Sequence, residues 1–332
     1  MKLDRKVLVI AMFALGACKS TAPDPGPPPA AATSPTAPAT AKPAPAIPAQ
    51  AQPATPGADP WSKPAPKKDP LARPMFWSIE KDGKTTFLLG TIHLGVDAET
   101  RLPDLVWKQL DAAPTFAMET DLSDGSLMDS FKRTSGTLHE ELGPAYWKKL
   151  EDALGPQVAK GIDGMKAMVP ASVLAMRGMP QTPPMDGILV ERAKREHKQI
   201  VFLEPASAET AVLEKWMDTR ALKEMLDDTE GPARQTALLD AYLAGDDAKM
   251  LALTDDERTE AVKHGYTNAE YDQEMDDLLF HRNASWIGAI EKLHAGGGGF
   301  IAVGAAHLIG KGSVLDLLAK RGYKVTRVAP PA

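Results

Sequence analysis

Two histidines occupy nearly the same local sequence at opposite ends of the chain. His93 lies in the segment GTIHLG, which begins at Gly90, and His307 lies in GAAHLIG, which begins at Gly304. Each segment follows a short apolar run, and this pattern predicts a strand that ends in a tight turn with an imidazole at its exit. Strand ends are where α/β proteins build their sites. Two imidazoles brought to one sheet edge would suit a divalent metal ion.

A single histidine near a strand end is usually a hydrogen-bonded structural residue. Here the repeat favours a shared role, because two unrelated turns would rarely place glycine and histidine at the same spacing, and glycine lets a ligand approach the backbone closely. The chain contains neither the GxSxG segment of a serine hydrolase nor the HExxH segment of a standard zinc peptidase. The other histidines, which lie among charged residues and are expected at the surface, are His139, His197, His264, His281 and His294.

Residues 1–18 predict a lipoprotein signal peptide. Basic residues near the start precede an apolar run that is too short to span a bilayer and that ends in Leu15-Gly16-Ala17-Cys18. This ending resembles the lipobox of bacterial lipoproteins, in which the signal is cut before the cysteine and the cysteine carries lipid. The resemblance implies lipidation at Cys18 and a place in the cell envelope, outside the cytoplasm; a plain signal peptide or an uncleaved anchor is the alternative. Lys19, by analogy with enteric bacteria, favours the outer membrane of a Gram-negative cell.

The following segment, residues 19–73, is dominated by Pro and Ala and has few large apolar side chains. Such a composition cannot bury a core, so it predicts a disordered tether. Cys18 is the only cysteine, which leaves the exported body without a thiol for a disulfide or a metal. A metal site there must use His, Asp, Glu or water, which favours manganese, cobalt, iron or zinc. The net charge of −6 argues against a nucleic-acid partner.

The body, residues 74–332, predicts an α/β fold with a central mixed sheet built from the N- and C-terminal halves and with long helical insertions. Segments 76–80 and 85–89 flank an Asp-Gly turn and predict a β-hairpin that leads to His93. The other predicted strands are 115–118, 198–203, 300–303 and 323–328; the predicted helices are 186–196 and 314–321, with helical stretches over 123–180 and 208–295. We expect strand 115–118 to lie beside the strand that precedes His93.

Several segments of the body resemble the TraB/PrgY/GumN family, which is related to the Tiki metalloproteases. The segments that carry the resemblance are GTIHLG, FAMETD, the stretch from Met185 to Glu204, His281 to Asn283, and FIAVGAAHLIG with its tail GYKVTRV. They cover nearly the whole body in the family's order. The resemblance implies an α/β fold of two related strand-GxxH-helix halves with a metal-dependent hydrolase site, and peptide cleavage as in the characterised animal members.

Three residues would form the centre of such a site. His93 and His307 would offer neutral imidazoles to a divalent ion, which we expect to be manganese, cobalt or zinc. Glu119, which follows the strand 115–118 and resembles the family's acidic residue at this point, would bind the ion or take a proton from a metal-bound water. Alternatively, Glu119 is a solvated glutamate at a strand end without a role in the site.

Other residues matched by the resemblance would surround this centre. Asp186 follows two prolines, so it either caps the helix 186–196 or, like Glu204, lines the pocket or orients a histidine. Arg282 would bind a substrate carboxylate or a carbonyl oxyanion, or else form a surface ion pair. The remaining residues expected around the pocket are Asn283, Gly90 and Gly304.

Together these features predict an extracytoplasmic, lipid-anchored, metal-dependent hydrolase, with a peptide or protein as its substrate and the membrane as a partner through Cys18. The first alternative is a non-catalytic envelope protein that binds a peptide signal or haem in the same pocket. The second is a catalytically inactive scaffold that its tether presents to an envelope partner. Metal content and a haem absorption band would separate these hypotheses.

Overall fold

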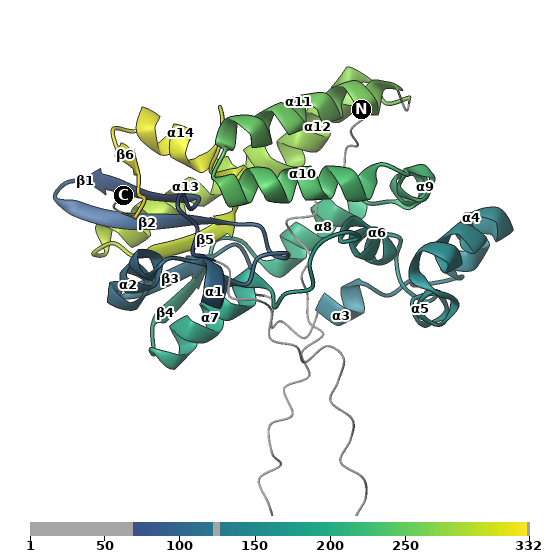
Figure 1. Ribbon diagram of the computed structural model, residues 1–332, viewed down its shortest axis with the longest axis horizontal. Helices are drawn as coiled ribbons and strands as arrows, with labels where there is room; N and C mark the ends of the chain where they lie inside the picture. The colour runs from purple at the N-terminus through teal and green to yellow at the C-terminus, as the bar shows by residue number, and fades with distance from the viewer. Residues whose placement is uncertain (1–68, 122–126, 264, 331–332) are drawn as a thin grey trace, which may run out of the picture. The chain divides into compact units, whose positions relative to one another are not determined.

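A computed structural model describes residues 69–121, 127–263 and 265–330 of the chain (Figure 1). The predicted signal peptide with Cys18, and the predicted tether up to residue 68, lie outside these ranges. Leu71, close to the start of the described chain, is already buried in the core. Within the described ranges, every helix is too short or too polar to cross a membrane.

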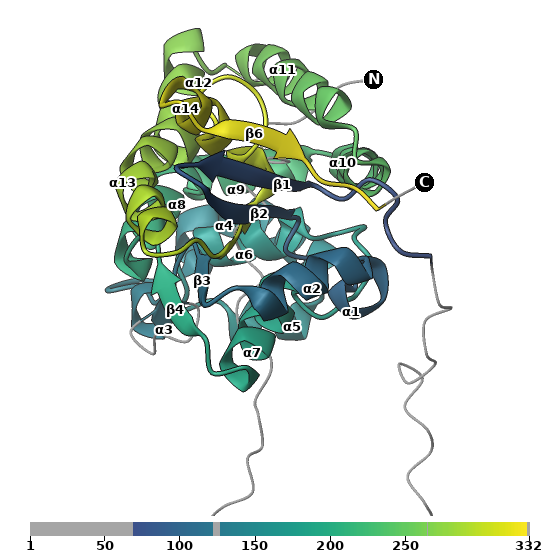
Figure 2. The same ribbon diagram turned by 90° about the vertical axis from the view of Figure 1, so that its left-hand side faces the viewer.

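Among the described residues, six strands form one mixed sheet, which confirms the α/β class. The strands are β1 (Phe76–Lys81), β2 (Lys84–Thr91), β3 (Thr115–Met118), β4 (Gln199–Phe202), β5 (Phe300–Gly304) and β6 (Lys324–Arg327). Their order across the sheet is β4-β3-β5-β2-β1-β6, and β1 is antiparallel to β2 and β6. The neighbours among β4, β3, β5 and β2 are parallel. The sheet therefore joins strands from both ends of the chain, as expected (Figure 2).

Strand β3 lies beside β5, so the expectation that it would lie beside β2 is wrong. Ala302 of β5 pairs with Met118 of β3 on one side and with Leu89 of β2 on the other. All five residues of β5 are buried, which is typical of a strand covered on both faces. Strands close in sequence are usually neighbours; here the apolar C-terminal strand is inserted between them.

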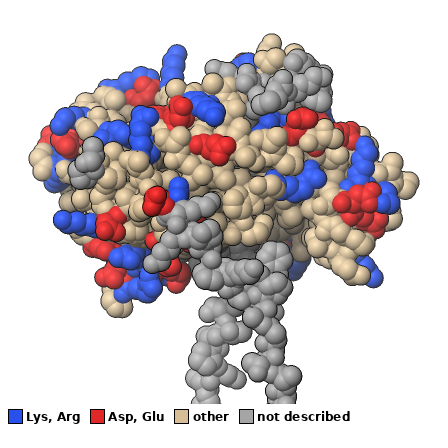
Figure 3. All heavy atoms as spheres, viewed as in Figure 1, with Lys and Arg blue, Asp and Glu red and all other residues tan. Residues whose placement is uncertain are grey.

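Helices surround the sheet and fill the long connections. They are α1 (Ala98–Arg101), α2 (Asp104–Ala112), α3 (Leu127–Ser130), α4 (Leu138–Leu154), α5 (Pro156–Gly161), α6 (Met168–Ala175), α7 (Met185–Arg195), α8 (Ala206–Trp216), α9 (Thr219–Asp227), α10 (Gly231–Ala244), α11 (Asp247–Lys263), α12 (Asn268–Met275), the π-helix η2 (Asp276–Phe280), α13 (His281–Ala295), the 3₁₀ turn η3 (Ala305–His307) and α14 (Val314–Lys320). In Figure 2, α13 lies on one side of the sheet and α2 on the other. On the face in Figure 3, acidic and basic side chains are interspersed.

The apolar core consists of two clusters. One covers the sheet, and the other joins the inserted helices. Leu278 and Leu279 of η2 belong to the helical cluster, whereas Ala305, at the end of β5, belongs to the sheet cluster. The π-helix and the second GxxH turn therefore meet where the two clusters adjoin, and π-helical turns occur frequently at functional sites.

His294 is buried, so its expected place at the surface is wrong. Thr86 Oγ1 lies 2.9 Å from its Nδ1, and the backbone oxygen of Lys81 lies 3.1 Å from its Nε2. His294 follows Ile290 by four residues on α13, so it lies on the apolar face of that helix despite its charged neighbours. Of the other histidines expected at the surface, His139, His197 and His281 are exposed and His264 lies outside the described residues.

Gly90, at the end of β2, is packed against the second GxxH turn. A Cβ added to it would lie 2.9 Å from the Cα of Ala305, closer than side chains and backbone approach in folded proteins. We therefore expect Gly90→Ala to lower the free energy of unfolding by about 1–3 kcal/mol through overpacking. Urea denaturation of the parent and the variant would measure this loss of unfolding free energy. Gly288→Ala is the control, because a Cβ at this α13 position meets nothing within 4 Å; similar losses in both variants would contradict the steric argument.

Candidate functional site

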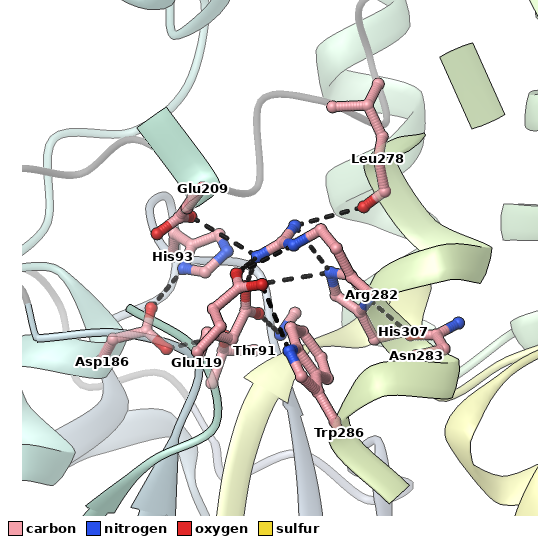
Figure 4. Close-up of polar contacts among 12 residues, drawn as sticks. Thr91, His93, Glu119, Asp186, Glu209, Leu278, Arg282, Asn283, Trp286 and His307 are labelled. Atoms are coloured by element: carbon pink, nitrogen blue, oxygen red, sulfur yellow. Dashed lines mark hydrogen bonds and ion pairs between the residues drawn. The ribbon is translucent and has the colours of Figure 1, made fainter. Parts of the chain in front are cut away.

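The candidate residues meet at the carboxyl edge of the parallel strands (Figure 4). Thr91, the last residue of β2, pairs with Gly304, the last residue of β5, so the two GxxH turns leave the sheet side by side. Glu119 follows β3 directly on the other side of β5. This is the edge at which open α/β sheets bind ligands. The sequence-based expectation that His93 and His307 lie together is met by this register.

His93 is held by Asp186, with its other ring nitrogen unpaired. Its Nδ1 is hydrogen-bonded to the Asp186 carboxylate, which also accepts a hydrogen bond from Thr91 Oγ1 at 2.9 Å. Its Nε2 is buried and has no hydrogen-bond partner among the described residues. The backbone of His93 has φ +53°, a left-handed conformation that non-glycine residues seldom adopt outside constrained sites.

Asp186 orients a histidine instead of capping its helix. It lies in the first turn of α7, but the residue at the cap position is Pro184, and no side chain caps that helix end. Burial lowers the pKa of His93, but the charge and hydrogen bond of Asp186, with Glu119 and Glu209, outweigh burial and leave the pKa above its ordinary value. A carboxylate behind one imidazole nitrogen is the arrangement that orients metal-binding histidines.

His307 is held in the same manner by an amide. Asn283 Nδ2 donates to the backbone oxygen of Gly312 at 3.0 Å, which fixes the orientation of the amide. Asn283 Oδ1 therefore faces His307 Nδ1 at 2.7 Å, so Nδ1 carries the proton and Nε2 carries the lone pair, which faces Arg282 Nη1. Burial lowers the pKa of His307, the charge of Glu119 opposes this, and Arg282 and His93 lower it as well, so that the pKa lies at about 3. His307 is thus a neutral imidazole.

Glu119 connects the two turns. Its Oε1 accepts a hydrogen bond from the backbone N–H of Gly304 at 2.6 Å, and its Oε2 accepts one from Arg282 Nη2 at 2.9 Å. Burial raises the pKa of Glu119, but His307, Arg282, His93 and the Gly304 amide outweigh it and bring the pKa to about 2. The carboxylate is therefore ionised, and the solvated strand-end alternative does not apply because the residue is buried.

Arg282 is the buried cation of the site. Only 3% of this residue is exposed, so it is not a surface ion pair. Its Nε donates to Glu204 Oε1 at 2.9 Å, and its Nη1 donates to the backbone oxygen of Leu278 at 3.2 Å. Nη1 also lies 3.4 Å from His307 Nε2. In this arrangement the guanidinium is occupied by the protein's own carboxylates and stands beside the lone pair of His307.

Glu209 was not predicted from the sequence. This α8 residue is buried, and its Oε1 lies 3.8 Å from Arg282 Nη2. Burial and the neighbouring Glu119 and Glu204 raise the pKa of Glu209 to about 8, although Arg282 lowers it. The sequence around it did carry a pattern that could have predicted its burial. Ala206 and Leu213, three residues before and four after Glu209, are buried on the same face of the helix. An acidic residue on an apolar face indicates a buried polar site.

Trp286 and Glu204 support the same cluster. Trp286 Nε1 donates to Glu204 Oε2 at 3.3 Å, and its ring lies 4.5 Å from the ring of His307. Glu204 thus belongs to the polar cluster around Arg282 and Trp286, and its expected place in a substrate pocket stays a prediction. Trp286 is fully buried and was not predicted, because aromatic residues on an apolar helix face are normally core residues.

Gly304 leaves the space in which these groups converge. A Cβ there would lie 3.4 Å from both Glu119 Oε1 and His93 Nε2, and 3.6 Å from His307 Cδ2. The three side chains expected to bind a metal therefore surround one point above the end of β5. Any larger residue at this position would fill the space between them.

The donors fit a divalent ion in kind, although they are not arranged as a finished cage. Both histidines are held through Nδ1 and direct Nε2 inward, and Glu119 is ionised. Across the described ranges, however, no three His, Cys, Asp or Glu side chains are placed to hold a metal ion as they stand. Arg282 lies beside His307 Nε2, so metal binding by this nitrogen would require the guanidinium to move.

Comparisons with known proteins agree with the resemblance seen in the sequence. No curated protein and no solved structure matches the chain. The model of the TraB/PrgY/gumN family matches residues 75–327, a range that includes all six strands and every residue of the site described above. The chain belongs to the TraB/PrgY/gumN family.

Proposed function

We propose that this protein is a metal-dependent hydrolase that uses His93, His307 and Glu119 to hold a divalent ion. The observation that supports the proposal most strongly is the unpaired, buried Nε2 of His93, whose Nδ1 is held by Asp186. A buried polar atom without a partner is costly. A metal ion would give this nitrogen the partner that the protein does not supply.

The distribution of charge supports a cation at this point. The buried carboxyl groups of the site are those of Glu119, Asp186, Glu204 and Glu209. Arg282 is the buried guanidinium among them, and His307 is neutral. Glu209 keeps its proton at neutral pH because its pKa is raised to about 8, yet the other carboxyl groups still outnumber Arg282. This excess favours a bound cation, since unpaired buried charge is strongly unfavourable.

A bound divalent ion would polarise a substrate carbonyl and lower the pKa of a coordinated water. The chain's own residues would complete the reaction. Glu119, which is ionised, can accept a proton in addition to binding the ion. Arg282, once moved away from His307 Nε2, would keep its positive charge close to the reacting groups and would stabilise an oxyanion. We propose peptides as substrates and manganese, cobalt or zinc as the ion.

Elemental analysis tests the metal site directly. The full chain, purified without chelator or metal-affinity resin, should contain near-stoichiometric metal, and His93→Ala and His307→Ala should each reduce it to background because each removes a ligand. His139→Ala is the control, since His139 is exposed. The loaded parent chain should then cleave a casein digest, and a chelator should stop cleavage.

The opposite result is equally informative. A parent chain that takes up no manganese, cobalt or zinc would overturn the hydrolase proposal and favour a protein that binds a peptide signal or haem without chemistry. A Soret band after incubation with haem would identify the haem version. The proposal also places the enzyme outside the cytoplasm, anchored through lipid on Cys18, which lies outside the described residues.

A further inference from the structure

A groove of about 780 Å³ lies beside the candidate site. Its walls come from α11, from the continuous α12–η2 helix and from the loop that follows His307. Sites of this volume commonly bind small molecules or a few side chains. The groove adjoins the hydrolase site described above through two of its wall residues: Asn283 of α13, which holds His307, and Ala306, which precedes His307.

Apolar side chains line the groove and remain partly open to solvent. Leu251 of α11 is 37% exposed and Phe280 of η2 is 40% exposed. The loop is held tightly against both: a Cβ at Gly310 would lie 2.8 Å from Leu251, and one at Gly312 would lie 2.9 Å from Phe280. Exposed apolar side chains along a concave surface are typical of a binding site.

The rim indicates which chemistry the groove accepts. Its charged residues, two of each sign, are Arg258, Lys311, Asp272 and Asp276. Arg258 is already paired with Asp272, with 2.5 Å between Nη2 and Oδ1. A phosphate or carboxylate head group would require a surplus of positive charge, ideally a free guanidinium. The balanced rim instead favours an occupant without net charge, such as a peptide backbone with apolar side chains.

Asn283 connects this groove to the candidate site. Asn283 lines the groove, and its side chain donates to the backbone oxygen of Gly312, which lies between the lining residues Lys311 and Ser313, and accepts from His307 Nδ1. Ala306, the residue before His307, also lines the groove. A chain bound there would therefore lie directly behind the His307 imidazole, within the reach of a peptide whose backbone passes through the site.

We propose that the groove binds apolar side chains of a peptide substrate, next to the bond that the site would cleave. That the bound peptide is a substrate rests on the proposed hydrolase function, but peptide binding to the groove requires neither metal nor hydrolysis. The groove would thus make the protein selective for peptides with leucine- or phenylalanine-like residues near the cleaved bond. Burying one such side chain should change the dissociation constant by about tenfold or more.

Fluorescence anisotropy in the presence of EDTA tests the binding without hydrolysis. The probes are two fluorescein-labelled hexapeptides with blocked ends, one with leucine and phenylalanine at its central positions and the other with serine there. The full chain should bind the apolar peptide at least about tenfold more tightly than the serine peptide. The double variant Leu251→Ser, Phe280→Ser should lose this preference. Val158→Ser is the control, because Val158 is an exposed apolar residue of α5.

A second pair of variants fills the groove instead of changing its polarity. Ala269→Trp, at an exposed position of α12 that lines the groove, should weaken binding of the apolar peptide by a similar factor. Ala208→Trp should not, since Ala208 is an equally exposed alanine in the first turn of α8. Thermal denaturation of each variant would show that the fold is retained.

Three results with the peptides would overturn the proposal. They are equal binding of both peptides, no saturable binding of either below about 1 mM, and retention of the full preference in both groove variants. Tighter binding of dansyl-undecanoic acid than of the apolar peptide would assign the groove to an acyl chain and would also overturn it. If the parent chain holds metal but does not prefer the apolar peptide over the serine peptide, only the groove assignment fails. If a chain that binds no metal still prefers the apolar peptide, the hydrolase proposal fails and the assignment of the groove as a peptide-binding site is retained.

Discussion

Replacing Arg282 with methionine is expected to lower the free energy of unfolding by about 3–5 kcal/mol. The variant keeps most of the apolar side-chain stem but removes the buried cation that contacts Glu119 and Glu204. Removing one partner of a buried ion pair is costly because the remaining charge stays buried without compensation. Chemical denaturation of the metal-free parent and variant would measure the loss.

A matched control separates burial from charge. Arg321→Met removes an arginine that is 52% exposed in its side chain and lies 2.8 Å from Glu291, and it should cost less than about 1 kcal/mol. Adding Glu204→Gln to Arg282→Met should restore part of the stability, because it removes one of the stranded carboxylates. A loss of under about 1 kcal/mol for Arg282→Met would contradict the buried charge cluster.

The stability advantage of Glu209→Gln over the parent chain should grow by about 3–4 kcal/mol between pH 5 and pH 8. The pKa of Glu209 is raised to about 8 from an ordinary value of 4.5 by burial and by neighbouring carboxylates. In the folded chain the proton stays bound, whereas the unfolded chain releases it above pH 4.5. The stability that this proton contributes is therefore complete below pH 4.5 and is lost as pH rises through about 8.

Unfolding free energies at a series of pH values, with EDTA present, would measure this effect. Glutamine keeps the shape of a protonated glutamate and cannot ionise, so the variant should lack this part of the pH dependence. Glu214→Gln, at an exposed position of the same helix, is the control and should follow the parent. Parallel curves for Glu209→Gln and the parent would show that Glu209 is ionised in the folded protein throughout this range.

The parts of the site that follow strands could be predicted from the sequence. His93 and His307 share a GxxH turn after an apolar run, and parallel strands end at a common edge, so their proximity follows from local pattern and general topology. Glu119 could be predicted for the same reason, because it directly follows a four-residue strand that the local composition indicates. The hairpin of β1 and β2 was likewise predicted from its Asp-Gly turn.

The parts contributed by helices could not be predicted with the same security. Arg282 lies 163 positions from Glu119, and nothing in its local sequence distinguishes a buried counter-ion from a surface arginine. Glu209 required knowledge of which face of α8 is buried, and the place of β5 between β3 and β2 depends on a pairing that local sequence does not specify. The groove beside Asn283 arises from the tertiary contacts of three separate segments.

The position of β5 at the middle of the sheet has a consequence for how this protein is made. Residues 300–304 leave the ribosome, or enter another compartment, after the four strands that they join or follow in sequence. Until they arrive, β2 and β3 lack the strand that separates them, and Glu119 lacks the Gly304 amide from which it accepts a hydrogen bond. Long-range strand pairing of this kind forms late in folding. The chain therefore acquires its candidate site only after residues 300–307 have been added, which keeps any activity away from shorter precursors.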